Sequence, residues 1–192
     1  MSNPPASTLI GTRKIASLNC SNSMKRTFKL SALFIAIAAT HCLPLLAGTL
    51  DTAPFKIAAP DADWKMDDSK SEEVGKDVVL IASLTHDKKE MKSVVLTGPV
   101  KPNPPVLSQL CAGIRDSFAN PAVKKISDTE TTFLGYKAQA LAYEVTQGGR
   151  TTYNEARVFV AQNKPWIISF SGPLSQKEAI KQMITYYQPK KP

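Results

Sequence analysis

Alternating apolar and polar residues predict β-strands along most of the chain beyond residue 54. Phe55–Ala58 alternates and is stopped by Pro60. This predicts a short strand at a sheet edge, because proline cannot donate a ladder hydrogen bond. The β-branched run 78–84 predicts a buried strand, and residues 94–96 predict its hairpin partner across the polar turn 86–92.

A second set of strands is predicted to follow as a meander. Short segments that contain turn formers separate four runs, a pattern typical of consecutive antiparallel hairpins. The runs are 124–133, 137–146, 151–161 and 165–171. In the second run, Leu141, Tyr143 and Val145 share one face and three alanines share the other. Neither face is strongly polar, so we expect helices on both sides of the sheet.

Two segments carry apolar residues at helical spacing. The first begins after a proline-rich crossover, 98–105, and its stripe consists of Leu107, Leu110, Cys111, Ile114 and Phe118. The second opens at Ser175 with Glu178 three residues later, which is the pattern of a capping box. Its apolar stripe continues to Pro189. Together, these patterns predict an α+β fold in which an antiparallel meander is flanked by helices.

The segment that precedes this domain has the layout of a secretory signal peptide, beginning at Met24. Basic residues lead into the apolar run 30–39, and a small-residue site at Ala47 and Gly48 follows, where a peptidase could cut. The basic residues are Lys25, Arg26 and Lys29. We therefore expect export to the periplasm or secretion, with the leader removed.

This layout divides the chain into three parts. We expect residues 24–47 to be the signal peptide and 48–192 a single α+β domain, with 1–23 an upstream misassigned start or a disordered arm. An uncleaved anchor would need ~20 apolar residues, and His41 interrupts the run. A lipid anchor at Cys42 would resemble a bacterial lipoprotein, whose motif has a small residue where this chain has His41. Membrane contact is therefore expected only during export.

The net charge of +8 overstates how basic the domain is. Residues 1–47 hold five basic residues and no acidic one, so the rest of the chain has 19 basic and 16 acidic residues, or +3. A nucleic-acid surface shows as a concentrated basic patch, so we expect no nucleic-acid partner. Cys111 is the only cysteine beyond residue 47. Its place on the helical stripe predicts a buried thiol.

The sequence offers few candidates for catalysis. His86 is the only histidine beyond residue 47, and we expect it in a solvent-facing turn. The chain contains no glycine-rich nucleotide motif, no nucleophile elbow and no zinc-protease motif. The acidic stretch 61–76 lacks the spacing of a calcium loop, so we expect a hydrated loop there and neither a metal nor a cofactor.

Four residues are candidates for binding. Trp64 lies in the acidic stretch, while Tyr153 lies with Arg150 and Arg157 near a predicted hairpin end. An aromatic ring and a guanidinium group at such a place could meet a partner. The alternative is that Trp64 folds back on the core and Tyr153 pairs across strands.

The order of elements resembles that of a known family. The segments that carry the likeness are 55–57 with Pro60 and Trp64, 133–138 with its Gly-Tyr-x-Ala turn, and 166–170. They resemble the Mog1/PsbP-like fold, including bacterial exported proteins of the DcrB and DUF1795 type. The resemblance implies an α/β/α sandwich and an accessory or interaction role without catalysis. It implies no site residues.

These observations favour an exported, non-enzymatic accessory or protein-binding domain of the bacterial cell envelope, with an immunity protein as one variant. Its partner would be another envelope or secreted protein. The alternative is a periplasmic small-ligand carrier or hydrolase that uses the acidic loop and Trp64. A deep pocket with convergent polar side chains would favour that alternative.

Overall fold

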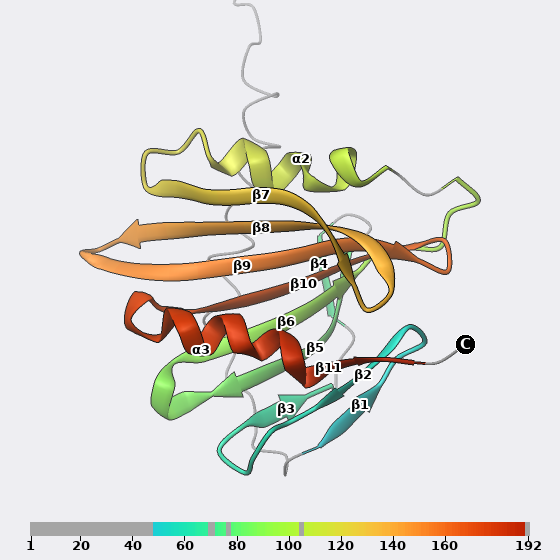
Figure 1. The fold of residues 1–192 in the computed structure, drawn as a ribbon, viewed down its shortest axis with the longest axis horizontal. Coiled ribbons are helices and arrows are strands. Elements are labelled where there is room, and N and C mark those ends of the chain that lie inside the picture. The colour runs from blue at the N-terminus through green and yellow to red at the C-terminus, as the bar shows by residue number, and fades with distance from the viewer. Residues whose placement is uncertain (1–47, 69–71, 76–77, 104–105, 191–192) are drawn as a thin grey trace, which may run out of the picture.

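The computed structural model describes residues 48–68, 72–75, 78–103 and 106–190 (Figure 1). The predicted signal peptide, 24–47, and the segment 1–23 lie outside the described residues. None of the described helices is long and apolar enough to cross a membrane.

An eight-stranded antiparallel sheet forms the centre of the described structure. Its order is β3-β5-β6-β10-β9-β8-β7, and β4 also pairs with β5. The strands are β3 (Lys65–Asp67), β4 (Glu72–Gly75), β5 (Val78–His86), β6 (Met91–Thr97), β7 (Val123–Phe133), β8 (Tyr136–Gln147), β9 (Arg150–Ala161) and β10 (Lys164–Pro173). The predicted meander is confirmed as β7–β10, and β10 joins it to the predicted hairpin, β5–β6.

Tight turns set the register of the meander. Each of its three turns has two central residues with positive φ, as in the type I′ turn, whose twist matches that of the flanking strands. The pairs are Leu134 (55°) and Gly135 (85°), Gly148 (57°) and Gly149 (77°), and Gln162 (53°) and Asn163 (59°). Because register decides which face each side chain occupies, these turns also decide which residues meet across the strands.

Residues 61–76, expected to form a loop, instead contribute two short strands. β3 pairs Met66 with Leu84, and β4 pairs Glu72 with Leu80, both on β5. Trp64 lies immediately before β3 and is buried. The acidic composition of this segment does not predict strands, and β3 and β4 form because they pair with β5.

A second, three-stranded sheet joins the first and last described segments. Its order is β1 (Thr49–Asp51), β2 (Phe55–Ala58) and β11 (Tyr187–Pro189), so β2 is central and the prediction of an edge strand is wrong. Pro60 lies beyond the end of β2 and therefore interrupts no ladder bond. The hydroxyl groups of Tyr187 and Ser93 lie 2.5 Å apart, which ties β11 to β6 of the large sheet.

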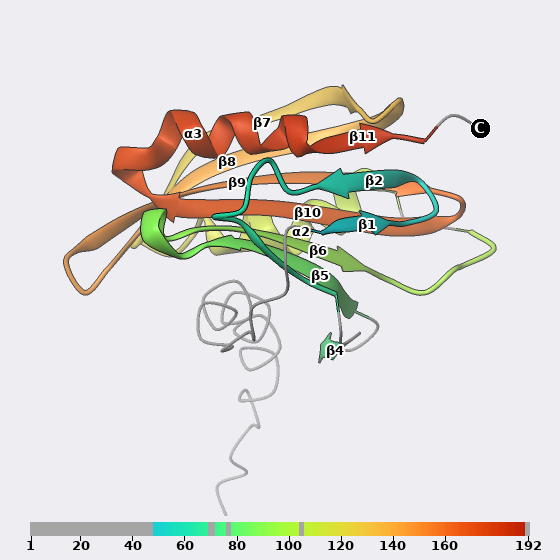
Figure 2. The ribbon, with the colours of Figure 1, turned by 90° about the horizontal axis from the view of Figure 1, so that it is seen from below.

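Helices lie on both faces of the large sheet, so the α/β/α sandwich is confirmed. On one face, α2 (Leu107–Ser117) packs Cys111 and Ile114 in a cluster with Leu141 and Val158. On the other face, α3 (Lys177–Gln182) contributes Ile180 to the larger core. Figure 1 shows α3 in front of β6 and β10, and Figure 2 shows it on one side of the sheet.

The C-terminal helix is shorter than its apolar stripe predicts. It begins at Lys177, and no side-chain hydrogen bond caps it, so the predicted capping box is wrong. Glu178 instead forms an ion pair with Lys181 (2.9 Å). After Gln182 the chain tightens into a 3₁₀ turn, Met183–Tyr186, and then enters β11.

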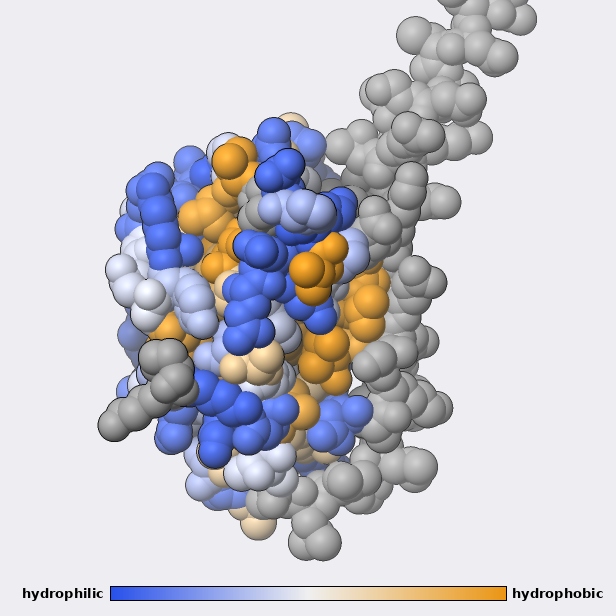
Figure 3. Space-filling model, turned by 90° about the vertical axis from the view of Figure 1, so that its right-hand side faces the viewer, coloured by the Kyte–Doolittle hydropathy of each residue, from blue (hydrophilic) through white to orange (hydrophobic). Residues whose placement is uncertain are grey.

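Few large apolar side chains of the described residues are exposed. The most exposed are Val100, within the proline-rich crossover, and Val106, directly after it, at 67% and 60%. The crossover meets the β9–β10 turn, where the Lys101 amide donates to the Asn163 carbonyl (3.1 Å). Figure 3 shows the side of the molecule at the right of Figure 1, where hydrophobic and hydrophilic residues are intermixed.

Candidate functional site

Two of the four predicted binding residues are packed into the core. Trp64 is 2% exposed, and its ring makes edge contacts with the rings of His86 (5.1 Å between centroids) and Tyr186 (5.5 Å). Tyr153 is also 2% exposed and belongs to the same core cluster. Neither ring is placed to contact a partner, in agreement with the alternative that both pack within the domain.

The two arginines lie in different surroundings. Arg157 forms an ion pair with Glu155, whose other carboxylate oxygen accepts a hydrogen bond from the Tyr153 hydroxyl (3.1 Å). Arg150 is exposed at the start of β9 and pairs instead with Glu90 (2.7 Å). The structure therefore brings Tyr153 and Arg157 together through Glu155, and only Arg150 is available at the surface.

His86 is buried, so the prediction of a solvent-facing histidine is wrong. It is the last residue of β5, is 3% exposed, and its Nδ1 makes no hydrogen bond. Alternation along β5 turns its ring toward Trp64, on the face that carries α3, and the charged turn begins only at Asp87.

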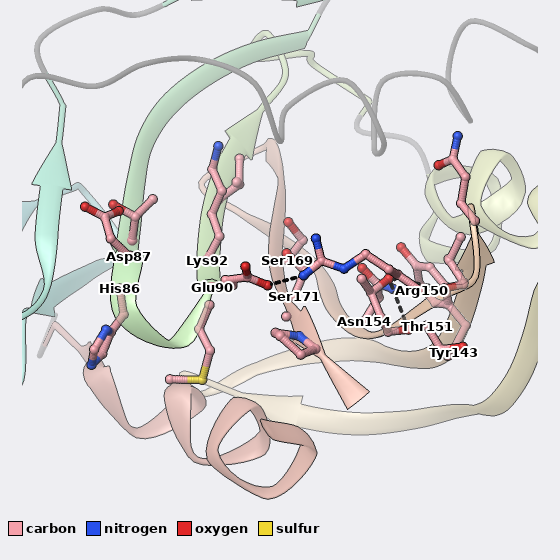
Figure 4. Close-up of a pocket in the computed structure, with 18 residues that line it drawn as sticks. His86, Asp87, Glu90, Lys92, Tyr143, Arg150, Thr151, Asn154, Ser169 and Ser171 are labelled. Atoms are coloured by element: carbon pink, nitrogen blue, oxygen red, sulfur yellow. Dashed lines mark hydrogen bonds and ion pairs between the residues drawn. The ribbon is translucent and has the colours of Figure 1, made fainter. Parts of the chain in front are cut away.

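A groove of about 660 Å³ lies on the opposite face of the sheet, beside α2 (Figure 4). Its floor is one row of cross-strand neighbours: Thr85, Lys92, Ser171, Asn154 and Tyr143, in that order across β5, β6, β10, β9 and β8. Adjacent strands lie about 4.8 Å apart, so the row spans about 19 Å. Every residue of the row is polar, and the whole row belongs to strands inside the sheet.

An ion pair marks one end of the groove. Glu90 lies in the β5–β6 turn and Arg150 is the first residue of β9, and their side chains are 58% and 76% exposed. Figure 4 shows Arg150 extending toward Glu90 beside Ser171. The pair joins two hairpins that are not neighbours in the sheet. Glu90 itself has a positive φ of 53°, an uncommon conformation for a residue other than glycine.

Several groups on the floor retain hydrogen-bonding capacity. The Asn154 amide nitrogen donates to Thr152 Oγ1 (3.1 Å), which orients its carbonyl oxygen as an acceptor. Within the described part of the chain, the hydroxyls of Ser169 and Ser171 make no hydrogen bond. Burial raises the pKa of Tyr143 well above its usual range, so its phenol stays protonated and can donate.

The described residues contain no group of three or more His, Cys, Asp or Glu side chains placed to hold a metal ion together. The hydroxyl, amide and phenol groups of the groove are typical of ligand binding and do not resemble a metal centre.

No protein-family model matches the chain, and no curated protein matches it. Among solved structures, cyanobacterial PsbP (CyanoP) from Synechocystis sp. PCC 6803 superposes with a TM-score of 0.55 over 79% of this chain and 98% of that chain, at 10% sequence identity. The chain therefore has the PsbP-like fold. This confirms the expected resemblance in fold.

Two further structures are similar at lower scores. LpqN, involved in cell envelope biogenesis of Mycobacterium tuberculosis, has a TM-score of 0.44 and 10% identity, over 77% of this chain and 90% of that chain. PA94 from Pseudomonas aeruginosa has a TM-score of 0.44 and 12% identity, over 77% of this chain and all of that chain.

The sequence did not reveal the groove of this PsbP-like domain, although a local signal was present. Ser169 and Ser171 alternate with the buried Ile168 and Phe170 in a strand that lies inside the sheet. Polar residues on one face of a central strand indicate that no helix covers that part of the face. The rest of the row became evident only once the strand order and register were known.

Proposed function

We propose that the chain is a non-enzymatic binding domain of the bacterial cell envelope and that the groove beside α2 is its binding site. The observation that carries the proposal is the polar row from Thr85 to Tyr143, which holds hydrogen-bonding groups on five paired strands. Groups held on a rigid sheet lose little conformational entropy when a ligand binds.

The groups in the groove favour binding over chemistry. His86, the one histidine among the described residues, turns its ring to the opposite face of the sheet. Cys111 is fully buried between α2, to which it belongs, and the sheet. The groove thus presents hydroxyl, amide and phenol groups together with the ionised side chains of Asp87, Glu90, Lys92 and Arg150, and the His86 ring and the Cys111 thiol lie outside it.

The envelope location rests on the signal-peptide layout of residues 24–47. In that location the partner would be another envelope or secreted protein, and an immunity protein remains one form of this proposal. The fold is compatible with each of these roles, because one fold hosts many functions.

A small-ligand carrier is the second candidate, and the groove favours it. A volume of about 660 Å³ lies within the usual range for small-molecule sites. The carrier would use the groove and not Trp64, because Trp64 is packed against His86 and Tyr186.

Site-specific photo-crosslinking in the native host tests the binding site. A photoreactive residue replaces Thr152, which lines the groove on the same face as Asn154, or Thr185, an exposed threonine after α3, in the full chain. We expect a specific adduct from position 152 and none from position 185. Equal labelling from both positions, or no adduct from position 152, would contradict the proposal, and mass spectrometry identifies the captured molecule.

A further inference from the structure

We infer that the groove binds an uncharged oligosaccharide, laid across the strands along the row from Thr85 to Tyr143. This inference rests on the proposed function, since it assigns a ligand class to the same groove. It follows from the charge balance of the groove, the geometry of its floor and the chemistry of the groups that remain available there.

Charge balance favours an uncharged ligand. The ionised side chains that line the groove are Asp87, Glu90, Lys92 and Arg150, two of each sign. Glu90 pairs with Arg150, and Asp87 pairs with Lys65. A strongly charged ligand would have to break one of these pairs or lie beside a group of like charge.

The geometry of the floor does not match the usual ways of binding a peptide. An added strand needs a free sheet edge, but each strand of the row has neighbours on both sides, and β5 lies between β6 and the short strands β3 and β4. A proline-rich peptide needs exposed aromatic faces, and the ring of Tyr143 packs against Phe118 (5.7 Å). A docked helix needs an apolar groove, whereas this floor is a polar row.

Sugar hydroxyls match the groups that remain available. Each sugar hydroxyl donates and accepts, as the hydroxyls of Ser169 and Ser171 also do, while Asn154 presents an acceptor and Tyr143 a donor. The row of about 19 Å is elongated, so it fits a chain of sugar units better than a single unit. In other β-rich folds, the surface of a sheet binds oligosaccharides.

Titration calorimetry on the full chain, purified as the host processes it, tests the ligand class. The probes are chitohexaose and cellohexaose, both uncharged, an oligogalacturonate of equal length, which is anionic, and an uncharged peptide rich in Ser, Asn and Gly. We expect at least one of the uncharged sugars to bind, with an affinity that is insensitive to ionic strength because no ion pair forms.

Serine variants locate the binding. The double variant Ser169→Ala/Ser171→Ala should bind the sugar about tenfold more weakly, because two hydrogen bonds are lost. The matched control is Ser175→Ala, an exposed serine outside the groove, which should bind as the unaltered protein does. Ser171→Trp should abolish binding by filling the groove, and thermal unfolding curves report whether each variant is folded.

Each remaining outcome rejects the inference. It fails if the oligogalacturonate binds more tightly than both uncharged sugars, if only the peptide binds, if no sugar binds, or if the double serine variant binds sugar normally. A specific adduct from position 152 together with failure of both uncharged sugars would retain the proposed function and reject only the ligand class. Loss of both signals would reject both.

Discussion

Arg115 of α2 and Asp128 of β7 form a two-pronged ion pair, with Nε to Oδ2 at 2.8 Å and Nη2 to Oδ1 at 3.0 Å. The Gln139 amide of β8 donates to the same carboxylate (2.5 Å). This cluster fixes α2 against two strands. The ring of Phe118, just after α2, contacts Tyr143 at the end of the polar row, so the pair also holds in place the helix end that packs against Tyr143.

We expect Asp128→Asn to lower the free energy of unfolding by about 1–2 kcal/mol, because it removes the charged acceptor of the cluster. The loss stays in this range because the Arg115 end of the ion pair is partly exposed and is screened by solvent. Urea denaturation measures the change. Glu130→Gln, on the same strand, is the matched control. Its ion pair with Lys137 is about two-thirds exposed at both ends, so the change should stay below about 0.5 kcal/mol. Equal losses in the two variants would contradict this account.

The Asp128 contribution should depend on pH. The Arg115 guanidinium that donates to Asp128 lowers the pKa of this carboxyl below its ordinary value of 3.8. The unfolded state therefore takes up the proton first as the pH falls, and the stabilisation is full well above that value and is lost below it. The difference in unfolding free energy between unaltered protein and Asp128→Asn should be constant from about pH 5 to 7 and shrink toward about pH 2. A difference that grows on acidification would refute the assignment.

Cys111 should be inert in the folded protein. Burial raises the pKa of its thiol to about 11, and the residue is 0% exposed. At about pH 8 the thiolate fraction is then roughly two hundredfold lower than for a free cysteine. We expect iodoacetamide to label Cys111 in denaturant and to label the native protein at least a hundredfold more slowly. Rapid native labelling would show that α2 opens in solution.

The β9–β10 turn offers a test of backbone strain. Gln162 has a φ of 53°, where a side chain costs about 1 kcal/mol that glycine avoids. Gln147, at the end of β8, serves as the control for the same chemical change in extended backbone. We expect Gln162→Gly to be more stable than Gln147→Gly by about 1 kcal/mol in thermal or urea unfolding. The reverse order would show that the turn does not carry this strain.

The long strands and both helical stripes could be predicted from the sequence because each is encoded locally. The alternation in β8 predicted Leu141 and Tyr143 on one face and the alanines on the other. In the structure, Leu141 and Tyr143 lie in the cluster that α2 covers, and Ala138 and Ala142 lie in the larger core on the opposite face. The three tight turns carry glycine or asparagine at positive φ, which is a short-range signal as well.

The wrong predictions concern elements that depend on distant partners. β3 has three residues, and nothing within that segment shows that it pairs with β5. Tyr187 continues the helical stripe in sequence, yet it leaves the helix because β2 is available to pair with it. The same limit applies to the groove, whose row takes one residue from each of five strands. The β-propensity of a segment is a weak predictor of a strand where pairing with a distant segment decides whether the strand forms.

The pairing of Ile57 in β2 with Tyr187 in β11 has a consequence for the order in which the domain folds. The contact joins segments from opposite ends of the described chain, so the loop it closes is among the longest available and forms late. Until Tyr187 has been synthesised, Phe55 and Ile57 lack part of the core that they share with it. This region of the core should therefore close only after translation has passed the last strand, whatever order the earlier hairpins follow.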